Sequence, residues 1–172
     1  MGGATKTIIG VVVVIGVAVG IWLAAPLFYD KEVNEELPGT APTTQPTGGG
    51  SNVQTNRATP TAAAPAVATL AQGTFTGFDE LHQAAGTARI VEADGKRYVR
   101  FDEDFTVTNG PDLYVYFGNN GEYDASTNIG RLKGNVGSQN YEIPDTINSD
   151  SYSEVWVWCR AFSVPFGKAV VR

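Results

Sequence analysis

The 21 residues from Ile8 to Phe28 carry no charged side chain. A helix of this length rises about 32 Å at 1.5 Å a residue, which matches the hydrocarbon core of a bilayer at about 30 Å. The run is also longer than the apolar region of a cleaved signal peptide, although cleavage after Ala18-Val19-Gly20 remains the alternative. The run predicts one retained transmembrane helix at residues 8–28, behind a short tail at residues 1–7.

The charges that flank the apolar run predict its orientation. Lys6 precedes the run, whereas the residues after it are mostly acidic: Asp30, Glu32, Glu35 and Glu36, with Lys31 as the one cation among them. Positive charge favours the cytoplasmic side. We therefore expect a single-pass protein of the cell membrane, with its N-terminus in the cytoplasm and its C-terminal part outside.

Residues 29–71 have the composition of a linker. From Leu37 to about Ala71 the chain is rich in Pro, Thr, Ala, Gly and Gln, and it has few large apolar side chains. Such a segment buries too little apolar surface to form a core. We expect a flexible tether with a root-mean-square reach of roughly 30 to 35 Å.

Residues 72–172 have the size of one ordinary domain. They contain nine Lys and Arg against fourteen Asp and Glu. Binding to a phosphate backbone requires a basic patch, so this charge excludes nucleic acid as a partner.

The sequence of the domain predicts a series of short strands. Residues 87–91 and 97–101 alternate between apolar and polar side chains, and Asp94-Gly95 between them is a tight hairpin turn. Similar short segments occur near residues 73–78, 105–107, 113–117, 139–143, 153–159 and 168–171, and no long helical period appears. The predicted fold class is all-β, as a β-sandwich or jelly-roll-like domain behind the transmembrane helix.

Cys159 is the one cysteine of the chain. A thiol in an exported domain is normally paired, so this one is a core side chain, a redox centre or a ligand. In an extended strand Cys159 shares a face with Val155 and Val157, which favours a buried and unreactive thiol. Arg160 next to it would stabilise a thiolate if the chain bends at this point.

Several blocks of residues in a fixed order resemble the DM-thirteen domain, also called the electron-transfer DM domain. They are His82 with Gly86-Thr87-Ala88, Asp94-Gly95, Asp104-Phe105, Val107 to Tyr116, Leu132-Lys133-Gly134-Asn135, Gln139-Asn140-Tyr141, Trp158 to Phe162 and Pro165-Phe166-Gly167. The resemblance spans residues 73–171. It implies a β-rich extracytoplasmic module of the kind that microbes carry as membrane-anchored single domains.

The resemblance also implies a redox or electron-transfer role centred on Cys159, either as a bare thiol or as the binding point of a haem-type group. His82, the one histidine, is the second candidate for cofactor binding. A Cys-x-x-Cys-His attachment motif is absent from the sequence. Such a role would require a redox partner protein.

Other chemistry has weaker support in the sequence. Asp104 and Asp112 offer oxygen ligands for calcium, but each also suits a turn or a solvated edge. No Gly-x-Ser-x-Gly elbow occurs, so a classical hydrolase is not indicated. The alternative to electron transfer is a binding or adhesion module for a carbohydrate, a cell-surface polymer or a protein, in which Cys159 only packs.

Overall fold

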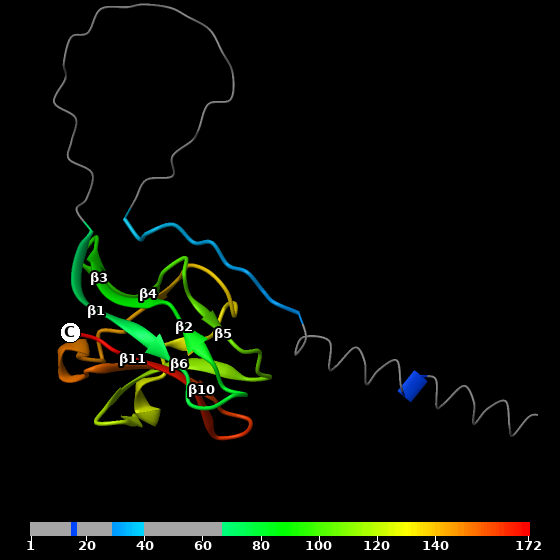
Figure 1. Cartoon of the computed structure of the whole chain (residues 1–172). Helices are drawn as coiled ribbons and strands as arrows, with labels where there is room; N and C mark the ends of the chain where they lie inside the picture. The colour runs from blue at the N-terminus through cyan, green and yellow to red at the C-terminus, as the bar shows by residue number, and fades with distance from the viewer. Residues whose placement is uncertain (1–14, 17–28, 40–66) are drawn as a thin grey trace, which may run out of the picture.

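The computed structural model describes residues 15–16, 29–39 and 67–172 (Figure 1). Residues 67–172 form an all-β domain, which confirms the predicted class. The strands are β1 (Ala68–Thr76), β2 (Ala84–Ala85), β3 (Thr87–Ala93), β4 (Lys96–Phe101), β5 (Thr106–Val107), β6 (Leu113–Asn119), β7 (Glu122–Tyr123), β8 (Gly130–Arg131), β9 (Gln139–Glu142), β10 (Glu154–Cys159) and β11 (Val164–Val170). Two 3-10 helices, η2 (Ala125–Thr127) and η3 (Ser149–Ser151), connect some of them.

Nine of these strands form one sheet in the order β7-β6-β10-β11-β1-β3-β4-β9, with β8 pairing β6 beside this path. Strand β1 is shared by both halves of the sheet, because residues 68–74 pair with β3 whereas Phe75 and Thr76 pair with β11. Gly73 lies near this switch, where a Cβ would collide with the carbonyl of Val170. The sequence predicts a sandwich or jelly roll, whereas the structure has one curled sheet that is continuous through β1.

The curled sheet encloses a single hydrophobic core. Side chains of β3 and β4, such as Ile90 and Phe101, belong to the same buried cluster as Val115 of β6 and Val157 of β10. The hairpin between β3 and β4 turns at Asp94-Gly95 as predicted, with positive φ angles of 52° and 73°. The alternation of apolar side chains was therefore a reliable guide to the strands.

A short N-terminal segment, residues 30–39, lies against this domain and is called the strap below. Glu32 forms a parallel bridge with Val136. The amide of Val33 donates to the carbonyl of Val136 at 2.9 Å, and the amide of Glu35 donates to the carbonyl of Ser138 at 2.9 Å. The sequence predicts that these residues belong to the linker, but they lie against the domain as an extended segment with one isolated β-bridge.

Most of the predicted transmembrane helix, residues 8–28, lies outside the described residues, which include only Ile15 and Gly16 from it. In the part of the chain that the structure describes, no helix has the length and apolar character needed to span a bilayer. Residues 40–66 of the predicted linker also lie outside the described part.

Candidate functional site

Cys159 is the last residue of β10 and lies between Leu113 of β6 and Val164 of β11. Its side chain is fully buried and belongs to the core cluster, together with Val155 and Val157. The predicted face of the strand is therefore confirmed. Because the thiol has no exposed surface, a reagent or a partner thiol in solvent has no direct access to it.

The side chains on the opposite face of β10 include aromatic rings that contact one another. Trp158 is half-buried, and its ring stacks on that of Tyr123, with centroids 4.0 Å apart and planes 22° apart. Tyr123 in turn meets Tyr116 edge to face at 5.3 Å. The tight turn at Asn120-Gly121, with φ angles of 54° and 85°, folds β7 back and puts Tyr123 over the sheet. The residue next to Cys159 thus belongs to an aromatic cluster at the outer surface.

Arg160 has partners other than the thiol. Its Nε lies 3.4 Å from Oδ2 of Asp112, and its guanidinium lies over the ring of Tyr114 at 4.1 Å. The backbone amide of Arg160 donates to the carbonyl of Asp112 at 3.0 Å. The cation is therefore held on the outer side of the sheet, while Cys159 points into the core.

His82 is held in the loop between β1 and β2. Its Nδ1 lies 2.8 Å from Oδ2 of Asp79, and its ring packs edge-on against Phe166 at 4.6 Å. The hydrogen bond from His82 lowers the pKa of Asp79, which also accepts from the amides of Leu81 and His82. Within the described residues, no hydrogen bond joins His82 to Cys159.

These positions do not fit a haem. An axial ligand needs an apolar pocket beside it that is large enough for the macrocycle. Cys159 is enclosed by core side chains, whereas His82 is held by Asp79 at Nδ1 and packs edge-on against Phe166. Within the described residues, the enclosed Cys159 therefore has no open face for a macrocycle.

The two acidic candidates lie in different surroundings. Asp104 accepts hydrogen bonds from the amide and the hydroxyl of Thr87, both at 2.9 Å, and so joins the start of β3 to the loop before β5. Asp112 is the ion-pair partner of Arg160 and lies 4.0 Å from Arg131. Across residues 29–39 and 67–172, no three His, Cys, Asp or Glu side chains form a group that would hold a metal ion.

A scan against protein-family models matched residues 75–171 to the model described as Electron transfer DM13. The match covers more than half of the chain. The chain belongs to the Electron transfer DM13 family. Comparison with curated proteins gave no match, and comparison with solved structures gave none either. The DM13 match includes Cys159, His82, Asp104 and Asp112, whereas the strap precedes it.

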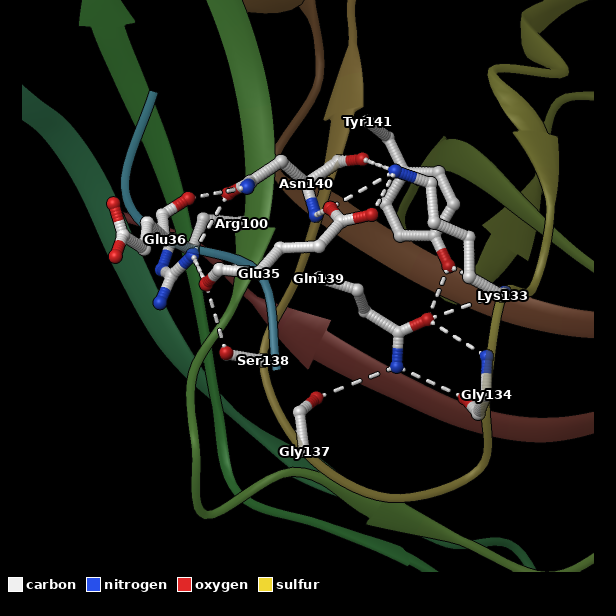
Figure 2. Close-up of polar contacts among 10 residues, drawn as sticks. All are labelled: Glu35, Glu36, Arg100, Lys133, Gly134, Gly137, Ser138, Gln139, Asn140 and Tyr141. Carbon is white, nitrogen blue, oxygen red and sulfur yellow. Dashed lines mark hydrogen bonds and ion pairs between the residues drawn. The ribbon is translucent and has the colours of Figure 1, made fainter. Parts of the chain in front are cut away.

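A polar network joins the strap to the DM13 domain (Figure 2). The carboxylate of Glu35 accepts from Nζ of Lys133 at 2.7 and 2.9 Å and from the amide of Asn140 at 2.7 Å. Its carbonyl accepts from the guanidinium of Arg100 and the hydroxyl of Ser138, both at 2.9 Å. Arg100 is buried in β4, so Glu35 provides an acceptor to a charge that water hardly reaches.

Gln139 organises the loop that receives the strap. It is fully buried, and its Oε1 accepts from the amides of Lys133 and Gly134 and from the hydroxyl of Tyr141. Its amide nitrogen donates to the carbonyls of Gly134 and Gly137. The Tyr141 hydroxyl is protonated at neutral pH, and burial raises its pKa further, so it keeps its donor role in alkaline solution as well. In the sequence, Gln139 stands out only as part of the Gln139-Asn140-Tyr141 block of the family resemblance, and Glu35 only as one of the acids after the apolar run.

The burial of Cys159 predicts its reactivity. In the native full-length protein we expect a small disulfide reagent to leave Cys159 unmodified, because the thiolate must contact the reagent to react. After unfolding in denaturant, one thiol per chain should react at the rate of a free cysteine. Thiol titration with and without denaturant measures this, and a fast reaction of the native protein would show that the thiol is exposed.

Proposed function

We propose that this chain is a membrane-tethered electron-transfer module of the extracytoplasmic space, with Cys159 as its redox group and a protein as its redox partner. The observation that carries the proposal is the match of residues 75–171 to an electron-transfer family. The charge-free run at residues 8–28 supports the tether, and the acidic residues after it support a cytoplasmic N-terminus. On this reading the protein is a membrane-anchored microbial form of the family.

The surroundings of Cys159 support electron transfer over thiol exchange. Exchange requires a thiolate to attack a disulfide sulfur directly, and the enclosed position of Cys159 excludes this approach. In electron transfer, by contrast, the oxidised partner would take one electron from Cys159 through packed protein without direct contact. The S–H bond would break with release of its proton, leaving a thiyl radical that a returning electron and proton restore to the thiol. The stacked rings of Trp158 and Tyr123, which begin one residue from Cys159, are the route that we propose to the partner.

The same burial favours a second candidate function. A fully buried thiol that packs with Val155 and Val157 also fits a simple core side chain. The chain would then be a binding or adhesion module for a carbohydrate, a cell-surface polymer or a protein. Its exposed loops and outer aromatic side chains would form the contact surface.

A redox titration separates the two functions. The full chain in detergent is titrated with a one-electron inorganic oxidant, and its absorbance spectrum is recorded before and after. We expect no Soret band, because the residues do not fit a haem, and we expect wild type to consume one reversible equivalent that Cys159→Ala lacks. If the two proteins consume equal amounts of oxidant and both are folded by circular dichroism, the result would favour the binding module. A Soret band that Cys159→Ala loses would instead identify a haem centre.

A further inference from the structure

The strap runs from one end of the domain to the other (Figure 1). At its start, Oδ1 of Asp30 accepts from the side-chain amides of Asn135 at 2.7 Å and Asn109 at 3.2 Å. At its end, Gly39 lies against Ala93 and Asp94 in the β3–β4 hairpin, where a Cβ on Gly39 would be 3.1 Å from that of Ala93. The strap therefore spans the domain lengthwise.

The path of the strap determines which part of the predicted linker can act as a tether. Strand β1 begins beside the same hairpin, because Ala68 pairs with Glu92. Residues 40–66 thus connect two points at one end of the domain, and they do not set the distance between the domain and residue 28. Only Tyr29 separates the apolar run at residues 8–28 from the first hydrogen bond of the strap at Asp30.

The end at which the strap starts also carries the most exposed large hydrophobic side chains of the described residues. They are Tyr29, Leu81 and Phe162, which are 72%, 78% and 68% exposed. The loop at residues 108–112 links all three positions. The hydroxyl of Thr108 donates to the carbonyl of Leu81, and the side-chain amide of Asn109 donates to Asp30. The carbonyl of Asp112 accepts from the amide of Arg160, which lies in the same turn as Phe162.

We infer that this end of the domain, called the membrane end, rests on the bilayer surface with Leu81 and Phe162 in the lipid interface. The inference rests on the proposed membrane anchor, since a helix at residues 8–28 would leave the bilayer directly beside this end. Aromatic and large aliphatic side chains at loop tips suit the boundary between headgroups and acyl chains. Single exposed apolar side chains are common on protein surfaces. Three that lie together beside the proposed membrane anchor indicate a contact surface.

The charges of the membrane end indicate which lipids it contacts. The cations there are Lys31, Arg131 and Arg160 and the acids are Asp30, Asp79, Glu80 and Asp112, so both signs are present in similar number. A polybasic surface would bind anionic headgroups selectively, and this end lacks that character. We therefore expect contact with a zwitterionic bilayer that needs no anionic lipid.

The test measures the lipid exposure of single side chains in the full chain, reconstituted into phosphatidylcholine nanodiscs. Leu81→Cys and Phe162→Cys are each labelled with a nitroxide, and electron paramagnetic resonance records their accessibility to oxygen and to a water-soluble nickel chelate. Leu70→Cys is the matched control, because Leu70 is also exposed and lies in β1 near the hairpin end. Wild type controls for labelling of the buried Cys159.

We expect a several-fold higher ratio of oxygen to nickel accessibility at positions 81 and 162 than at position 70. If the ratios are equal at the three positions and the chains stay with the nanodiscs during gel filtration, the membrane end does not contact lipid. The proposed anchor would still stand in that case. Loss of the chain from the nanodiscs would overturn the anchor itself, and with it this inference. All three replaced side chains are exposed, so the substitutions should not disturb the fold.

Discussion

Removal of the strap is expected to destabilise the domain by about 3 to 5 kcal/mol, because it removes several hydrogen bonds that each contribute about 0.5 to 1.5 kcal/mol. Arg100 is only 5% exposed and loses the carbonyl of Glu35, while the amide of Asn140 loses the Glu35 carboxylate. The ion pair of Glu35 with Lys133 is partly solvated and contributes about 1 kcal/mol or less. Urea unfolding of residues 29–172 and of residues 67–172, followed by tryptophan fluorescence, measures the difference.

Single substitutions show whether the effect comes from the network. Glu35→Gln keeps the backbone contacts of the strap and removes the charge, so it should cost a fraction of the full deletion. Glu32→Gln is the matched control, because the Glu32 side chain is exposed and bonds only to Asn34 within the strap. Equal unfolding midpoints for the long and the short chain would contradict a structural role for the strap.

The substitution Gln139→Leu is expected to cost about 3 to 5 kcal/mol as well, since a buried polar group that loses its partner costs about 1 to 3 kcal/mol. Leucine has a similar volume, but it cannot accept from Lys133, Gly134 and Tyr141 or donate to Gly134 and Gly137. The loop of residues 133–138, on which the strap lies, should loosen with it. The measurements are urea unfolding and limited proteolysis between residues 29 and 39.

Gln72→Leu provides the control for Gln139→Leu. Gln72 is exposed on β1, so the same chemical change there should shift stability by about 0.5 kcal/mol or less. If Gln139→Leu unfolds at the same urea concentration as Gln72→Leu, the five hydrogen bonds of Gln139 do not stabilise the loop.

The elements that the sequence predicted are those with a strong local signal. The alternation at residues 87–91 and 97–101 and the turn at Asp94-Gly95 located β3, β4 and their hairpin. The same reasoning put Cys159 on the core face of β10. In each case the side-chain pattern of a few neighbouring residues determines the structure, so no long-range information was needed.

The strap and its network could not be predicted in this way. Residues 30–36 are mostly charged, and charged segments next to a Pro- and Thr-rich stretch have the composition of a linker. Their partners, such as Arg100 and Lys133, lie more than 60 residues away in the sequence. These contacts are made by polar side chains and backbone amides, so the strap has no periodic pattern of apolar residues that would predict them. The stack of Trp158 on Tyr123 was missed for a similar reason, because it depends on how β7 folds back.

The central claim is that Cys159 carries the redox activity of the domain, and film voltammetry of matched proteins tests it most directly. Wild type, Cys159→Ala and Trp156→Phe are compared on one electrode, each as the full chain. Trp156 lies on the same outer face of β10 but stacks on Phe78 instead of Tyr123, so its replacement controls for changes to that face. We predict a reversible wave in wild type and in Trp156→Phe that Cys159→Ala lacks while it stays folded. The same response from all three proteins would contradict the claim and leave Cys159 as a core side chain.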